Sequence, residues 1–395
     1  MSEYQIFSDT DRVLQTISEE ITAVKHLRSI YKKQHEEGIE PRYWKTPKGM
    51  RPTVGHIMLL GPAGCGKTRS ANKIADMMNL KEGKNFHRVS ADAFPNIQDF
   101  INFLLENLTW HGYLCDNGQV FHTEHTGCVR NGRRCCKIVD PVNPRGPVPP
   151  VIIFFDEIHM MPKKIQDKIG VILLESYYSL HTDRGVKTIY FPRFTMIGAT
   201  TDVGMLSPAL QSRFKVQVPV SYYHDSEMEE IVQKMLETKN SMSVNKEAVE
   251  ILAKCAQGVP RNAENHIDRL MSHWISGVKH KGWNPDDLID GEKITAFYDN
   301  LKYIPEGYTF NQIELLKYLA TGNIDKKGNR VGLGITKICH RFGIDKLNFL
   351  HNWEPVLQRK GLICTGTRGR EITPKGLEFL QKLSEKYPGC DWDVH

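Results

Sequence analysis

The chain has 395 residues, of which 40% are apolar and 25% charged, with nine cysteines and a formal net charge of +6. This length predicts two or three domains, and the composition is that of a folded protein and excludes wholesale disorder. There is no run of 18 uncharged apolar residues and no export signal at the start, so we expect a cytoplasmic protein with no membrane contact and no disulfide framework. The mild positive charge fits nucleic acid contact, but a solvated surface explains it equally well.

Near the start of the chain, apolar residues at helical spacing predict one amphipathic helix over residues 11–35. A segment rich in Pro, Gly and Lys follows it. Residues 56–60 then form a short apolar run, which predicts a strand that leads into a glycine-rich turn.

The glycine-rich turn predicts a site for ATP and Mg²⁺. It matches the phosphate-binding pattern GxxxxGK[ST] without a gap, and it lies between a strand and a helix as that pattern requires. Its backbone N–H groups would face phosphate oxygens, Lys67 would reach the β and γ phosphates, and the Thr68 hydroxyl would bind Mg²⁺. A chance glycine turn is the alternative, but it leaves the strand-to-helix context unexplained. The predicted nucleotide-binding residues are Gly61, Pro62, Ala63, Gly64, Cys65, Gly66, Lys67, Thr68 and Arg69.

A second apolar strand, residues 151–155, ends in the sequence Asp-Glu-Ile-His. Asp156 at the end of a buried strand would hold Mg²⁺, and Glu157 beside it would polarise the attacking water. Such an acidic pair is weak evidence alone, since many strands end in acids. Together with the phosphate-binding turn it predicts ATP hydrolysis.

A third strand, residues 194–198, begins a longer stretch, PRFTMIGATTDVGMLSPALQSRF. This stretch and the preceding DEIH resemble the RuvB family of Holliday junction branch migration helicases, which are ring-forming AAA+ ATPases. The resemblance implies that Thr200 is the polar sensor of the γ-phosphate. It also implies that Arg213 is the arginine finger, which acts on the nucleotide of a neighbouring subunit. From the residue alone, Arg213 would more simply be a surface arginine that caps a helix C-terminus.

The resemblance continues through AQGVPRNAENHIDRL, where Arg261 takes the place of the second sensor arginine of the lid. Tyr223 matches a tyrosine that lies beside the adenine in the family, and a helix is expected to begin near Asp225. Both assignments rest on position. A lone tyrosine at such a junction is more often a core residue, and helices commonly carry arginine.

The last ninety residues are typical of a winged helix. Three helical stretches, 311–319, 335–342 and 347–359, precede two short strands around a glycine turn. Arg368 and Arg370 lie at that turn, where basic side chains can contact DNA phosphates or the minor groove. A winged helix used only for protein contact is the alternative.

The resemblance covers residues 11–387 and implies an α/β AAA+ P-loop core, a helical lid and a C-terminal winged-helix domain. We expect domain ranges of 1–220, 221–300 and 301–395. An insert of about forty residues, 110–150, departs from the family pattern. Its thiols and imidazoles predict either a structural Zn²⁺ site or a β-rich loop with free thiols, and its spacing contains no CxxC pair. The residues concerned are His111, Cys115, His122, His125, Cys128, Cys135 and Cys136.

Two further segments bear on nucleotide and partner contacts. The family's IGQ box is present only as Val13, Leu14 and Gln15, which puts the N-terminal nucleotide contacts in doubt. Residues 179–190 occupy the place of the β-hairpin that docks on the junction-binding protein RuvA, with 183–185 as the predicted turn.

The sequence and the resemblance thus predict an ATP-driven ring motor, for which we expect a homohexamer that moves duplex or branched DNA. Two alternatives stay open. One is an AAA+ DNA-loading or clamp-loading switch, and the other is a winged-helix DNA-binding module in which ATP only holds the fold. An intact Glu157 argues against the second, since a structural site has no need of a water-activating acid.

Overall fold

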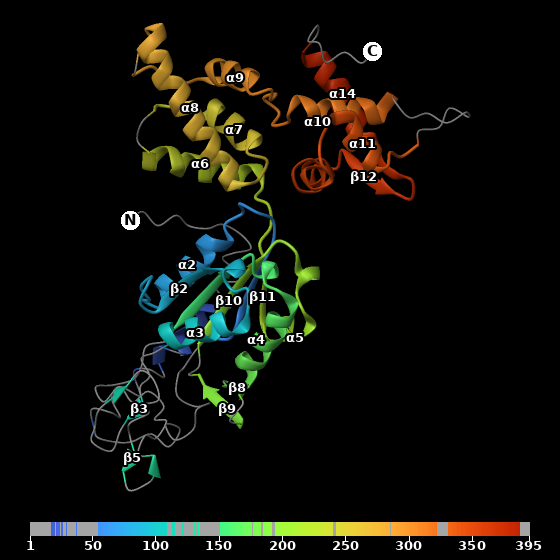
Figure 1. The fold of residues 1–395 in the computed structure, drawn as a ribbon. Coiled ribbons are helices and arrows are strands. Elements are labelled where there is room, and N and C mark those ends of the chain that lie inside the picture. Colours follow the sequence, from blue (N-terminus) through green and yellow to red (C-terminus); the bar gives the residue numbers. More distant parts are fainter. Residues whose placement is uncertain are drawn as a thin grey trace. The chain divides into compact units, whose positions relative to one another are not determined.

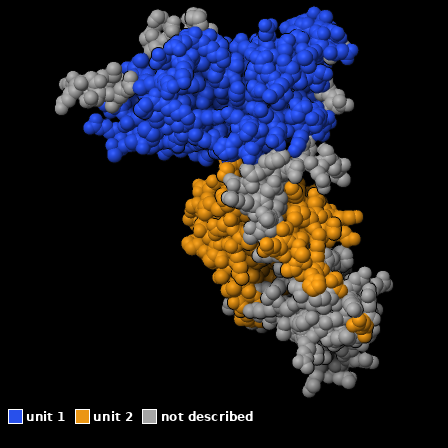
Figure 2. Space-filling view, turned by 180° about the vertical axis from the view of Figure 1, so that it is seen from behind, with its two compact units in different colours: residues 1–4, 222–395 blue, residues 5–221 orange. Residues whose placement is uncertain are grey.

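The structure is a computed structural model. It describes residues 54–108, 151–321 and 331–387, apart from 176, 183–184, 192–193, 240–241 and 285. Elsewhere it describes single residues between 17 and 37, those from 17 to 29 being helical, and four short strands between 113 and 134. Figure 2 shows two compact units, residues 5–221 and residues 222–395.

A parallel five-stranded sheet forms the centre of the first unit (Figure 1). The strands lie in the order β11-β1-β10-β7-β2. Their bounds are β1 (Ile57–Leu60), β2 (Phe86–Ser90), β7 (Ile152–Asp156), β10 (Thr195–Thr200) and β11 (Val216–Pro219). All four residues from Ile152 to Phe155 are fully buried, which explains why this strand is a continuous apolar run rather than an alternating one.

The pairing register brings the ends of the strands to one edge of the sheet. Leu60 pairs with Thr200, and Ser90 pairs with Asp156. Because parallel strands end at the same edge, the residues that follow β1, β7 and β10 meet there. The glycine-rich loop, Asp156 and Thr200 lie at this edge.

Helices cover this sheet, and a hairpin adjoins it. The helices are α2 (Lys67–Met77), α3 (Ile97–Asn107), α4 (Lys163–Glu175) and α5 (Pro208–Gln211), with 3₁₀ turns η2 (Ala91–Ala93), η3 (Ile158–Met160) and η4 (Val203–Met205). The strands β8 (Tyr177–Thr182) and β9 (Gly185–Tyr190) pair in an antiparallel hairpin directly after α4, which confirms the predicted hairpin. Within the insert, β3 (Tyr113–Leu114) pairs with β4 (Val120–Phe121), and β5 (Val129–Arg130) pairs with β6 (Arg133–Arg134).

The second unit holds two separate hydrophobic cores. The first core lies among α6 (Asp225–Lys239), α7 (Lys246–Cys255), α8 (Pro260–Lys281) and α9 (Gly291–Asn300). The second lies among α10 (Phe310–Thr321), α11 (Ile335–Phe342), α12 (Lys346–Asn348), η5 (Phe349–Trp353), α13 (Glu354–Arg359), the strands β12 (Ile363–Gly366) and β13 (Gly369–Ile372), and α14 (Pro374–Lys386). We call the first the lid and the second the winged helix. None of the helices that the structure describes is long and apolar enough to cross a bilayer.

The winged helix differs from the sequence prediction in one element. A single helix was expected over 347–359, but the structure has α12, a π-helical turn over Phe349–Trp353, and α13. Pro355 lies in the first turn of α13 and has no N–H to donate, so the regular hydrogen-bond pattern cannot run through it. The chain accommodates the proline by widening the preceding turn.

Candidate nucleotide site

The glycine-rich loop joins β1 to α2 at the carboxyl edge of the sheet. Gly61 lies so close to β11 that a Cβ atom there would be 1.9 Å from the carbonyl oxygen of Val220. Gly66 is the N-cap of α2 and has φ 97°, in the left-handed region that favours glycine. These two positions explain why the loop needs glycine, and they leave its N–H groups at a helix N-terminus that favours anions.

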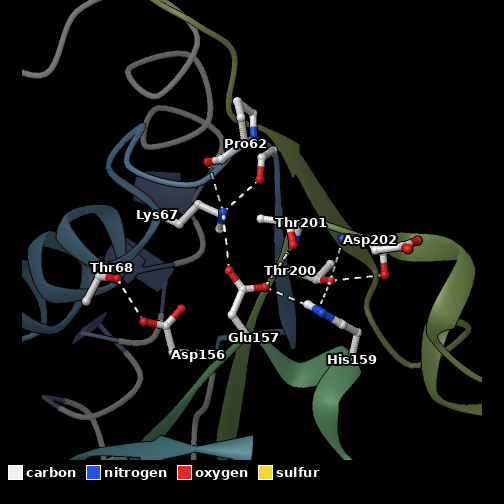
Figure 3. A network of polar contacts seen from close by, with 10 residues as sticks. Pro62, Lys67, Thr68, Asp156, Glu157, His159, Thr200, Thr201 and Asp202 are labelled. Carbon is white, nitrogen blue, oxygen red and sulfur yellow. Dashed lines mark hydrogen bonds and ion pairs between the residues drawn. The ribbon is translucent and has the colours of Figure 1, made fainter. Parts of the chain in front are cut away.

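Lys67, the first residue of α2, is 5% exposed and is held at this loop (Figure 3). Its ammonium donates to the carbonyl oxygens of Gly61 at 2.7 Å and Pro62 at 3.0 Å. The Nζ atom lies 3.9 Å from Oε1 of Glu157. A fixed positive charge therefore stands between the phosphate-binding loop and the predicted catalytic acid.

The next residue, Thr68, contacts the first acid of the DEIH sequence. Its hydroxyl donates to Oδ2 of Asp156 at 3.2 Å. A hydroxyl and a carboxylate oxygen this close together, beside a phosphate loop, are the oxygen ligands that Mg²⁺ prefers. The residues present therefore fit the predicted magnesium site.

Glu157 turns away from Asp156 because its backbone is left-handed, with φ 46°. Its Oε2 atom accepts hydrogen bonds from the backbone N–H and the hydroxyl of Thr201, both at 3.1 Å. The Nδ1 atom of His159 lies 3.2 Å from the same oxygen. The two neighbouring acids thus contact different partners. Asp156 contacts Thr68, and Glu157 contacts Thr201 and His159.

Thr200, the last residue of β10, is fully buried. Its hydroxyl donates to the carbonyl of Asp202 at 3.1 Å, accepts from the Asp202 N–H at 3.0 Å, and lies 2.9 Å from Nδ1 of His159. Because the hydroxyl proton is used on Asp202, Nδ1 of His159 is the donor in its hydrogen bond with Thr200, and the same nitrogen lies 3.2 Å from Oε2 of Glu157. One histidine nitrogen thus contacts both the predicted sensor and the predicted catalytic acid. The sequence analysis assigned no role to His159 or Thr201, although the fourth residue of DEIH and the second threonine of GATT were the signals for them.

Arg213 follows α5 in the chain and is partly buried. Its Nε atom donates to the carbonyl oxygen of Gly170 in the middle of α4 at 3.1 Å. A Cβ atom on Gly170 would be 3.2 Å from the carbonyl oxygen of Ala209, so the two helices are in close contact here. The arginine is thereby fixed to α4, and its action on a neighbouring subunit remains a prediction.

The other predicted nucleotide contacts are distributed over both units. Arg69 is exposed on α2, in the first unit. Tyr223 and Arg261 belong to the second unit. Tyr223 is 9% exposed within the lid core and donates its N–H to Gly258 at 3.0 Å, whereas Arg261 is exposed in the first turn of α8. Their contacts with nucleotide stay predictions.

The two predicted DNA-contacting arginines differ in their surroundings. Arg368 is exposed at the turn between β12 and β13. Arg370 instead donates to both carboxylate oxygens of Glu354, at 2.9 and 3.0 Å, and the side chains of this pair are only 16% and 8% exposed. Arg370 therefore holds the wing against α13 through a bidentate ion pair.

Among the described residues, no group of three or more His, Cys, Asp or Glu side chains could hold a metal ion. The predicted zinc ligands are outside that search, because their side chains lie outside the described residues. The same is true of Val13, Leu14 and Gln15. The zinc and the N-terminal nucleotide contacts stay predictions.

A P-loop whose lysine and threonine meet a pair of acids and a buried threonine at one sheet edge defines an ATPase of the AAA class. Residues 57–222 match the model of the AAA family, described as ATPases associated with various cellular activities. Residues 307–381 match the model of the RuvB C-terminal winged helix domain. The two models together match more than half of the chain, and the chain belongs to the RuvB family.

Individual relatives agree with this assignment. The chain is 25% identical over 349 residues to the Holliday junction branch migration complex subunit RuvB of Lacticaseibacillus casei, which covers 87% of this chain and 86% of the relative. It is 26% identical over 351 residues to the same subunit of Lactobacillus helveticus, with 88% and 84% covered. Among solved structures, two mutants of Thermotoga maritima RuvB have TM-scores of 0.61 and 0.60 at 20% and 21% identity, covering 95% of this chain and 95% and 96% of theirs. These structures support the fold.

Proposed function

We propose that this protein is an ATP-driven motor that drives branch migration of Holliday junctions in DNA recombination and repair. The observation that carries the proposal is the hydrolytic arrangement around Glu157, on a chain whose C-terminal domain is a RuvB-type winged helix. A DNA-loading switch remains a formal alternative, but the winged-helix match and the relatives' names favour the motor.

In cis, the chain would position ATP and water with Lys67, Thr68, Asp156 and Glu157. Lys67 would neutralise charge on the β and γ phosphates, and Thr68 and Asp156 would hold Mg²⁺. Bound there, Mg²⁺ would offset charge on the phosphate oxygens. Glu157, oriented by Thr201 and His159, would accept hydrogen bonding from the attacking water.

In trans, Arg213 would stabilise the transition state at the site of a neighbouring subunit, so that hydrolysis requires a ring, for which a homohexamer is proposed. The anchoring of its Nε to α4 supports a fixed reach for the guanidinium. Arg261, at the start of α8, would report the γ-phosphate to the lid.

DNA would be contacted by the wing. Arg368 is exposed and can reach phosphate, whereas the Arg370 guanidinium is engaged by Glu354 and would act through the shape of the wing. A RuvA-like partner would dock on the β8–β9 hairpin. Zinc in the insert is proposed as a structural ion only, and metal analysis of the purified protein decides it.

The test of the motor is ATP hydrolysis with and without four-way junction DNA, together with strand exchange at the junction. In Glu157→Gln we expect both to be lost, with hydrolysis reduced roughly 100-fold or more, because a general base contributes at least this much. The control is Glu82→Gln, a carboxylate whose side chain is 64% exposed. Hydrolysis by the wild type without any strand exchange would contradict the motor and favour a loading switch.

A further inference from the structure

The second unit contains a contact between the winged helix and the loop that leads into α8. Arg359, the last residue of α13, donates from Nη2 to the carbonyl oxygen of Gln257 at 2.7 Å. Its guanidinium carbon lies 4.3 Å from the centroid of the Tyr222 ring. The arginine is therefore both hydrogen-bonded and stacked against two segments of the lid.

The lid segment is shaped to receive this guanidinium. Gly258 has φ +73°, and a Cβ atom there would be 2.9 Å from Nη1 of Arg359 and 2.6 Å from the carbonyl oxygen of Tyr223. Any other residue would collide with the arginine and with the lid backbone. The glycine before Val259 thus leaves room for a side chain that arrives from the winged helix.

Gln257 is held by the winged helix from a second direction. It is 8% exposed and has a left-handed backbone, with φ 55°. Its side-chain amide donates to the carbonyl oxygen of Gly307 at 2.9 Å and to Oε1 of Gln312 at 2.8 Å. A buried amide that donates both of its protons has a defined orientation, so these bonds fix the loop relative to α10 as well as α13.

A further ion pair lies beside this contact, between Lys360 and Asp225, at 2.6 Å. Both side chains are more than a third exposed, so this pair contributes little to the free energy of unfolding and mainly restricts the orientation of α13 relative to α6. Asp225 begins α6, and the Tyr222 ring precedes it in the chain. The winged helix therefore contacts the starts of two lid helices, α6 and α8.

We propose that Arg359 couples the winged helix to the nucleotide-sensing loop of the lid, so that the two move as one body during ATP turnover. Gln257 and Gly258 lie four and three residues before Arg261, and Arg359 lies nine residues before Arg368 at the wing. A change at the loop would thus be passed toward the proposed DNA-contacting turn, and Arg359 is the side chain that contacts both the Gln257 carbonyl and the Tyr222 ring. Arg359 is a positioning residue in this scheme, and the scheme rests on the proposed motor function.

Arginine is suited to this contact because its planar guanidinium can stack on a ring and donate to a carbonyl at the same time. Lysine would keep the charge and lose the stacking. Arg359→Lys is therefore expected to be intermediate between wild type and Arg359→Ala. The matched control is Arg341→Ala, since the Arg341 guanidinium also lies 4.3 Å from a tyrosine ring centroid, that of Tyr318, but within the winged helix.

The first measurement needs no DNA. Spin labels carried by unnatural amino acids at the exposed positions Ile275 on α8 and Leu347 on α12 report the lid-to-winged-helix distance in the full-length protein. We expect one narrow distance distribution in wild type and Arg341→Ala, and a broad one in Arg359→Ala. An equally narrow distribution in Arg359→Ala would overturn the proposal, whether or not the protein proves to be a motor.

The second measurement is ATP hydrolysis with and without duplex DNA, with DNA affinity measured alongside. In Arg359→Ala we expect unchanged basal hydrolysis and DNA affinity, but a loss of DNA stimulation of roughly fivefold or more, the lower end of coupling between distant sites. Stimulation equal to that of Arg341→Ala would also overturn the proposal. If wild type shows no stimulation, the motor function fails, and the distance measurement still decides the coupling.

Discussion

At the scale of single residues, the proposed catalytic acid, Glu157, is held in place by two neighbours, Thr201 and His159. Glu157 accepts two hydrogen bonds from Thr201, and Nδ1 of His159 lies 3.2 Å from Glu157 and 2.9 Å from the buried Thr200. Held in this way, the carboxylate has a defined direction before any nucleotide arrives. Preorganised groups lose less freedom at the transition state, so their effect falls on the rate of the chemical step.

His159→Ala should therefore lower kcat for ATP by about tenfold, with little change in KM, because it removes orientation and not phosphate binding. The measurement is steady-state hydrolysis at saturating ATP. In a Glu157→Gln background the same change should have no further effect, since there is no carboxylate left to orient. Additive losses in the double variant would show that His159 acts elsewhere.

At the scale of elements, the wing carries a proposed DNA contact, Arg368, two residues before a structural contact, Arg370. Arg370→Ala removes the cationic partner of the buried Glu354 carboxylate, which keeps hydrogen bonds from Gln358 and Thr365, and this loss should cost about 3 kcal/mol. Arg368→Ala should change stability by less than about 0.5 kcal/mol. Chemical denaturation measures both.

The same two variants differ in DNA binding. Arg368→Ala should weaken duplex binding at all sequences and reduce the salt dependence of binding by about one phosphate contact. Binding that is insensitive to Arg368→Ala would place the DNA contact on another surface.

Within the lid, α8 contains a histidine whose burial makes the lid sensitive to acid. His266 lies 3.0 Å from the Tyr298 hydroxyl, and burial, with a smaller contribution from Arg269, lowers its pKa from 6.5 to about 4. The unfolded chain binds a proton at His266 near pH 6.5, whereas the folded lid does so only near pH 4. The free energy of unfolding is therefore unaffected by His266 above pH 6.5 and falls by about 3 kcal/mol in all as the pH drops toward 4. Hydrogen exchange in α8 at pH 7.5 and 4.5 should show this loss in wild type and a smaller loss in His266→Gln.

Much of the fold and part of the site could be predicted from the sequence, because the signals are local. The phosphate loop, the acids after β7 and the hairpin after α4 are each contained in fewer than fifteen residues. The bond from Thr201 to Glu157 joins residues 44 apart, and the one from Arg359 to Gln257 joins residues 102 apart. Such contacts depend on strand order and packing, which no local pattern encodes. At Arg370 the local pattern, a basic residue on a wing, predicted a DNA contact. The structure instead pairs this arginine with Glu354, sixteen residues away in the chain.

At the scale of the whole molecule, the proposed ring predicts that two inactive variants complement each other when they are mixed. Arg213→Ala lacks the trans-acting arginine, and Glu157→Gln lacks the acid in cis. In a mixture, an Arg213→Ala subunit beside a Glu157→Gln subunit has a complete site, so ATP hydrolysis should reappear. The control mixture of Glu157→Gln with Lys67→Ala should stay inactive, because each subunit's own site is defective. Full activity of Arg213→Ala as a monomer would contradict the ring.

The anchoring of Arg213 to α4 has a consequence for such a ring. Gly170, which holds the arginine, lies five residues before the end of α4, roughly 8 Å along the helix, and the β8–β9 hairpin begins two residues after that end. A displacement of the hairpin would therefore move Arg213 through α4 alone, without any change in the central sheet or in the subunit's own nucleotide site. A protein bound to the hairpin of one subunit would therefore control ATP hydrolysis at the site of the next subunit. Subunits around the ring would then hydrolyse ATP in the order in which that protein binds their neighbours.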